Sequence, residues 1–147
     1  MRYYLVTLAC IISVASFVTS CNTVEPVTDF DDLIDRLQLA GAAVETTVDT
    51  VRNLHLSVAG VVIVVSDERV KVFEYEDVAQ AQLEFEALTG GGPDLVFFEE
   101  DEPPVTEYVP LNRLCYHSGR FILLYDGEDE AVLKTLRVTL GRPSPPG

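Results

Sequence analysis

The stretch VVIVVSDERVKVFEY, residues 61–75, decides the fold. Residues 61–65 are apolar without alternation, which is typical of a central strand whose two faces are both covered. Residues 66–69 have the polar composition of a turn. Residues 70–75 contain valine and aromatic residues, which favour a second strand. We therefore predict a β-hairpin that contributes a central strand to an antiparallel sheet.

A helix is predicted directly after this hairpin. Asp77 is a good N-cap residue, and Gln80 occupies the position at which it would complete a capping box. The sequence GGGP at residues 90–93 ends the helix. Helical periodicity gives this helix an expected buried stripe of Val78, Ala81, Phe85 and Leu88.

The second half of the chain repeats this order in residues 112–140, NRLCYHSGRFILLYDGEDEAVLKTLRVTL. Strands are expected at 113–117 and 120–125 around a Ser118-Gly119 turn, followed by a helix over 128–140. Leu133, Leu136 and Leu140 share one face of that helix. The repeated order indicates an internal ββα duplication, although two unrelated hairpin–helix units would look the same.

Further elements extend outward from these two units. Phe30, Leu33, Ile34 and Leu37 have helical spacing after a cap at Thr28 or Asp29, and Gly41 stops this first helix. Strands are expected at 44–50, 54–58, 95–98 and 105–109. The predicted fold is α+β: a mostly antiparallel sheet with three helices packed on one face. We predict a single domain over residues 29–141 and a disordered or polyproline tail at 142–147.

The first twenty residues predict a secretory signal that is removed from the mature protein. Arg2 precedes an apolar run of about fourteen residues, shorter than the roughly twenty that a membrane-spanning helix needs. The ending Val18-Thr19-Ser20-Cys21 resembles the lipobox of a bacterial lipoprotein signal. This resemblance implies cleavage between Ser20 and Cys21, and acylation of Cys21 with fatty acids such as palmitate. An ordinary cleaved signal, with Cys21 incidental, is the alternative.

A short tether is expected between Cys21 and the domain, over residues 21–28. The seven residues 22–28 (NTVEPVT) have little apolar content and no periodicity. Fully extended, they would reach about 23–25 Å, so the domain would stay close to the bilayer.

Several short segments also resemble a family of small bacterial lipoproteins whose activity is uncharacterised. They are Ala40-Gly41-Ala42, the strand VFEYED at 72–77, the strand GRFILLY at 119–125 and the closing Leu140-Gly141. The resemblance would cover residues 28–141. It implies a location in the cell envelope, facing outside the cytoplasm on the cell membrane or the outer membrane, and it implies no particular activity. This chain lacks the tryptophan-rich strand that such proteins tend to carry.

The acidic composition limits the partners that the protein can have. There are 24 acidic and 10 basic residues, for a net charge of −14. Binding to nucleic acid or electrostatic adsorption to anionic lipid would need a basic patch. We therefore expect no nucleic-acid partner and membrane attachment only through the lipid anchor on Cys21. Solvation is the simplest explanation of the acidic excess, and a cation-binding surface is an alternative.

Residues with catalytic or metal-binding chemistry are present but isolated. Cys115 lies in an apolar strand and is expected to be a buried, inert thiol. His55 and His117 have no second ligand at metal spacing. The acidic runs 99–102 and 126–130 lack the spacing of a calcium loop, and the second is explained by the start of a helix. We expect no metal and no cofactor.

No catalytic motif of a known hydrolase class is found in the mature sequence. Glu74, the carboxylate closest to aromatic residues, is placed by strand alternation on the face opposite Phe73 and Tyr75, as a solvent-facing residue would be. The sequence therefore predicts a lipid-anchored envelope protein with a non-catalytic binding or structural role. An envelope hydrolase that uses paired carboxylates is the competing hypothesis.

Overall fold

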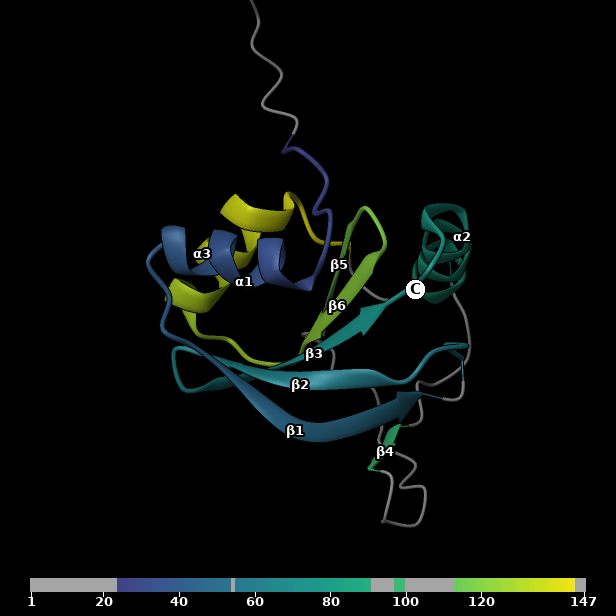
Figure 1. The fold of residues 1–147 in the computed structure, drawn as a ribbon, viewed down its shortest axis with the longest axis horizontal. Coiled ribbons are helices and arrows are strands. Elements are labelled where there is room, and N and C mark those ends of the chain that lie inside the picture. The colour runs from purple at the N-terminus through teal and green to yellow at the C-terminus, as the bar shows by residue number, and fades with distance from the viewer. Residues whose placement is uncertain (1–23, 54, 91–96, 100–112, 145–147) are drawn as a thin grey trace, which may run out of the picture.

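The computed structural model describes residues 24–53, 55–90, 97–99 and 113–144 (Figure 1). The predicted signal peptide, Cys21, the strand expected at 105–109 and the acidic residues 100–102 lie outside the described residues. The elements in chain order are α1 (Phe30–Leu39), β1 (Val44–Asn53), β2 (Gly60–Val65), β3 (Glu68–Glu74), α2 (Val78–Thr89), β4 (Phe97–Glu99), β5 (Leu114–Ser118), β6 (Phe121–Tyr125) and α3 (Glu130–Leu140).

The described strands form one antiparallel sheet in the order β4-β1-β2-β3-β6-β5. The predicted α+β class is confirmed, and β2 lies inside the sheet between β1 and β3, as the apolar run 61–65 indicated. The two predicted hairpins, β2–β3 and β5–β6, join through the pairing of β3 with β6. That pairing brings the two halves of the chain together in the middle of the sheet.

The hairpin turns explain how each strand pair is registered. Ser66 and Asp67 both have positive φ angles, of 50° and 71°, and Val65 pairs with Glu68 across them. Two consecutive residues of this kind form the primed turn whose twist matches that of a hairpin. In the second hairpin Ser118 pairs with Phe121, so the turn lies at Gly119 and Arg120, one residue later than predicted.

Helices cover both faces of the sheet, so the predicted packing of all three on one face is wrong. Figure 1 shows α1 and α3 together on one side of β5 and β6, and α2 on the other. All five residues of β6 are buried because alternate side chains enter opposite cores. Phe121, Leu123 and Tyr125 pack in the core with α1 and α3, whereas Ile122 and Leu124 pack in the core with α2.

The two ββα units share their order of elements but not their orientation. Tyr75 directly follows β3 and Tyr125 ends β6, the corresponding strand of the second unit, yet the two tyrosines lie in opposite cores. A two-fold axis perpendicular to the sheet would place equivalent residues on the same face. The only feature of the suggested duplication that the two units share is therefore the order of their elements.

Aspartate side chains begin all three helices. Asp29, Asp77 and Asp129 each accept a hydrogen bond from a backbone N–H in the first turn of α1, α2 and α3. Gln80 does not form the predicted capping box with Asp77, and its side-chain amide donates to Ser57 Oγ at 2.8 Å.

The stripe predicted for α2 is right at Ala81 and Leu88, which are buried, and Phe85 packs partly against the same core. Val78 is 53% exposed, because its side chain lines a surface hollow instead of the core. The strand predicted over 54–58 is also absent from the described part of that range. The chain turns after β1, where the His55 N–H donates to Asn53 Oδ1 at 2.7 Å and the Leu56 N–H to the Asn53 carbonyl at 3.2 Å.

Both expected ends of the domain lie too far inward. Val27, assigned to the tether, is 2% exposed and belongs to the core. At the other end, Ser144 exchanges two backbone hydrogen bonds with Cys115, of 3.0 and 2.8 Å, and so adds to the edge of β5. The segments 24–28 and 142–144 both belong to the folded domain. Backbone groups of Val27 in the first segment and of Ser144 in the second form hydrogen bonds with β5.

Candidate functional site

The residues predicted to be cleaved and lipidated, Ser20 and Cys21, lie outside the described residues. The first described residue, Val24, follows Cys21 by three positions. The place where the chain enters the domain is therefore the part of the predicted attachment site that the structure describes. We call residues 24–28 the entry segment.

The entry segment is fastened to the β5–β6 hairpin. The Val27 N–H donates a buried hydrogen bond to Ser118 Oγ at 3.0 Å, and Arg120 Nε donates to the Thr28 carbonyl at 3.1 Å. Gly119, between these two contacts, has a φ of 57°. A Cβ atom there would overlap the Val27 carbonyl oxygen, so the close approach of the hairpin requires glycine.

The entry segment is also held by α1. The guanidinium of Arg36 donates to the carbonyl of Glu25 at 2.6 Å and to that of Pro26 at 3.2 Å. Asp32 orients this guanidinium through its Oδ1, 2.8 Å from Arg36 Nε, and its Oδ2 accepts from the Thr28 N–H at 2.9 Å. The hydrogen bond from Arg36, followed by that from Thr28, holds the pKa of Asp32 below its usual value.

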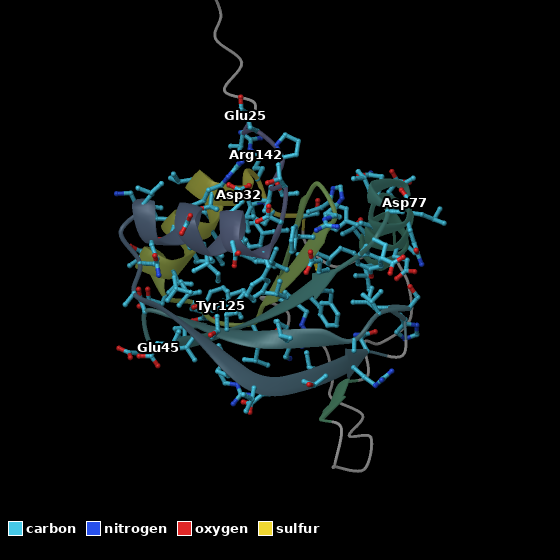
Figure 2. All side chains as sticks on the ribbon, in the orientation of Figure 1. Glu25, Asp32, Glu45, Asp77, Tyr125 and Arg142 are labelled. Carbon is cyan, nitrogen blue, oxygen red and sulfur yellow. The ribbon has the colours of Figure 1, made fainter. Side chains whose placement is uncertain are left out.

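A largely apolar hollow of about 570 Å³ opens beside the entry segment. Val24 and Val78, on its rim, are 38% and 53% exposed. In the view of Figure 2, Glu25 lies at one end of the domain and Glu45 lies toward the opposite end. The hollow is lined by Val24, Pro26, Val27, Thr28, Val78, His117, Ser118, Gly119, Arg120 and Leu140.

Cys115 and His117, the side chains with thiol and imidazole chemistry, have structural surroundings. Cys115 is buried, as the sequence indicated, and burial raises the pKa of its thiol to about 11. His117 stacks on Phe85 with ring centroids 5.2 Å apart, and burial lowers its pKa. Among the residues that the structure describes, no group of three His, Cys, Asp or Glu side chains could hold a metal ion.

The acidic run 126–130 divides into two roles. Asp129 caps α3 and Glu130 begins it, two residues later than the start predicted at residue 128, so these two acids do belong to the start of a helix. Asp126 instead forms ion pairs with Arg113 and Lys71. Burial alone would raise the pKa of Asp126, but hydrogen bonds and charge from these two cations outweigh burial and hold that pKa below its usual value.

Glu74, the other candidate, is paired with Arg120 at 2.7 Å and is partly exposed. Sequence reasoning missed Glu84, which accepts hydrogen bonds from the Tyr75 hydroxyl at 2.7 Å and from the Ser57 N–H at 2.9 Å. Burial raises the pKa of Tyr75, and so does this carboxylate. The signal was available: Glu84 lies three residues after Ala81, on the inward stripe of α2.

Neither the helices nor the comparisons with known proteins add a further candidate site. Within the described ranges, no helix has the length and apolarity that crossing a membrane requires. No protein-family model, curated protein or solved structure matches this chain.

Proposed function

We propose that this chain is a lipid-anchored protein of the cell envelope with a non-catalytic binding or structural role. The supporting observation is the position of the entry segment, which is fastened to the domain beginning three residues after Cys21. In this proposal the signal is cleaved after Ser20, and acyl chains on Cys21 hold the domain at a membrane.

The physical basis of the attachment is hydrocarbon burial. One acyl chain gives marginal, reversible membrane binding, whereas two or more hold a protein stably. Three residues span at most about 11 Å when fully extended, so an anchor at Cys21 would keep Val24 next to the headgroups. A loose tether of seven residues is not required, because Val27 is already part of the core.

The engagement of the candidate acids and bases supports a non-catalytic role. Glycosidase-type hydrolysis needs two carboxyl groups that converge on a cleft. Asp126 is bound by Arg113 and Lys71, and Glu84 is bound by Tyr75 and Ser57. Each of these carboxylates satisfies neighbouring donors, which is what structural acids do.

The test is to express the full chain in a bacterial host that is supplied with an alkyne-tagged palmitate. We expect the mature protein to carry the label, to begin at Cys21 by mass spectrometry, and to sediment with membranes. Cys21→Ser should abolish labelling and release the processed domain from membranes. Cys10→Ser is the matched control, because Cys10 lies within the signal, and it should change neither result.

Sedimentation of the Cys21→Ser product with membranes to the same extent as the wild type would contradict the proposal. An unmodified Cys21 in the membrane fraction would contradict it as well.

A further inference from the structure

We propose that the surface around the hollow faces the bilayer, with Val24 and Val78 at the boundary between headgroups and acyl chains. We call this surface, defined by Val24, Pro26 and Val78, the anchor face. The inference rests on the proposed lipidation of Cys21 and adds a fixed orientation of the domain to it.

The first argument is distance. Val24 lines the hollow, and only two residues separate it from Cys21. Because three residues reach about 11 Å at most, an acylated Cys21 keeps this rim of the hollow within that distance of the membrane. The other end of the domain, marked by Glu45 in Figure 2, lies away from the point where the chain leaves.

The second argument is rigidity. A flexible tether would let the domain turn any face toward the lipid. Here the Val27 N–H is bonded to Ser118, and Arg36 binds the carbonyls of Glu25 and Pro26. The chain from Glu25 onward is therefore fixed to β5, β6 and α1, so a lipid anchor at Cys21 would act on the domain at a fixed point beside the hollow.

The third argument is the chemistry of the face. The net charge of −14 opposes approach to anionic lipid, so attraction must come from apolar contact. Val24 and Val78 present partly exposed apolar side chains on the rim. Arg120, which also lines the hollow, has its charge balanced by Glu74 at 2.7 Å. A zwitterionic bilayer is therefore the surface that this face fits.

The experiment places one cysteine on the anchor face and one far from it. Val78→Cys tests the face, and Val48→Cys is the matched control, because Val48 in β1 is 99% exposed. Cys115 is buried with a raised pKa, so within the described residues the engineered thiol is the reactive one. Each lipidated full chain is labelled with an environment-sensitive fluorophore and reconstituted into phosphatidylcholine vesicles whose acyl chains are brominated near the headgroup.

We expect bromine to quench the label at residue 78 at least about threefold more than the label at residue 48, since interfacial contacts insert to about 5–10 Å. The emission at residue 78 should also shift to shorter wavelength when vesicles replace detergent. Equal quenching at the two positions would overturn the proposal. Cross-linking through residue 78 in detergent would overturn it too, because the face would then be covered by a second copy of the chain.

Flotation of the vesicles separates this inference from the proposed function. Protein that floats without selective quenching at residue 78 retains the anchor and refutes the oriented face. Protein that does not float refutes the anchor itself.

Discussion

The two carboxylate oxygens of Asp126 accept hydrogen bonds from two nitrogens of Arg113, a side chain with no exposed surface. Arg113 Nε binds Oδ1, and Nη2 binds Oδ2 at 3.1 Å. Lys71 Nζ completes the cluster at 3.1 Å from Oδ2. Burying a guanidinium is costly unless an opposite charge lies close by, so this pair allows Arg113 to be fully buried.

Asp126→Asn should lower the free energy of unfolding by about 3 kcal/mol, because it leaves a buried guanidinium without its counter-charge. Urea denaturation at pH 7 measures the change. Asp49→Asn is the control: Asp49 pairs with Arg69 at the surface, where both side chains are well exposed, and its loss should be below about 1 kcal/mol. Equal losses in the two variants would contradict the assigned role of Asp126.

Acid should destabilise the wild type more steeply than Asp126→Asn. The pKa of Asp126 in the folded protein lies below its ordinary value of 3.8, so its stabilising contribution is complete above that value. This contribution is lost as the pH falls through the depressed pKa, from about pH 4 downward. Denaturation midpoints at pH 7, 5, 4 and 3 should therefore fall less in the variant. Parallel profiles would show that another group is responsible.

Gly119→Ala should release the entry segment. The new Cβ would overlap the carbonyl oxygen of Val27, so the hydrogen bond from the Val27 N–H to Ser118 should break. Hydrogen exchange at the Val27 amide should become faster by at least about tenfold, which corresponds to about 1.4 kcal/mol.

Gly41→Ala is the control for this variant. Gly41 also has a positive φ, of 96°, but no atom lies within 4 Å of the added Cβ. It should therefore destabilise the protein without selectively exposing the Val27 amide. If the Val27 amide stays protected in Gly119→Ala, the entry segment does not depend on this contact.

Tyr75→Phe should cost about 1 kcal/mol, because the hydroxyl donates to Glu84 at 2.7 Å from a buried ring. Gln82→Ala is the control. It removes the exposed pair of Gln82 with Glu86 on α2, the helix that carries Glu84, and should change stability by less than about 0.5 kcal/mol. Thermal unfolding of both variants provides the comparison. A neutral Tyr75→Phe would mean that water replaces the hydroxyl at Glu84.

Cys115 should resist thiol reagents at pH 7 until the domain unfolds. Its pKa of about 11 leaves very little thiolate, and its side chain is buried. Labelling by a maleimide should therefore speed up only as urea approaches the unfolding midpoint. The exposed thiol of Val78→Cys serves as the positive control. Prompt labelling of the folded wild type would show that the core opens readily around Cys115.

Local pattern accounts for most of the elements. Helical spacing of apolar residues predicted the helices, with Asp77 as the cap of α2, and apolar runs with polar turns between them predicted both hairpins. The distribution of helices over the two faces was missed, although residues 121–125 carried its signal. FILLY is apolar at every position, like 61–65, and such a strand needs cover on both sides.

Other features left no readable pattern. The pairing of Ser144 with Cys115 uses backbone groups only, so no side chain marks it. The burial of Arg113 depends on contacts between residues that are distant in sequence, such as Lys71 and Asp126. The hollow is similar, because Val24, Val78 and Leu140 meet only after the chain has folded. The resemblance to a lipobox, in contrast, comes from four neighbouring residues, 18–21. These lie outside the described residues, so the lipidation of Cys21 stays a prediction.

The pairing of Ser144 with Cys115 has a consequence for self-association. An outer strand with bare amide and carbonyl groups is a template onto which a neighbouring molecule can add its own strand. The backbone N–H and carbonyl of Cys115, the second residue of β5, are occupied by those of Ser144. Ser144 thereby covers part of this edge, and we expect that shortening the chain before Ser144 would make strand addition by a neighbouring molecule easier.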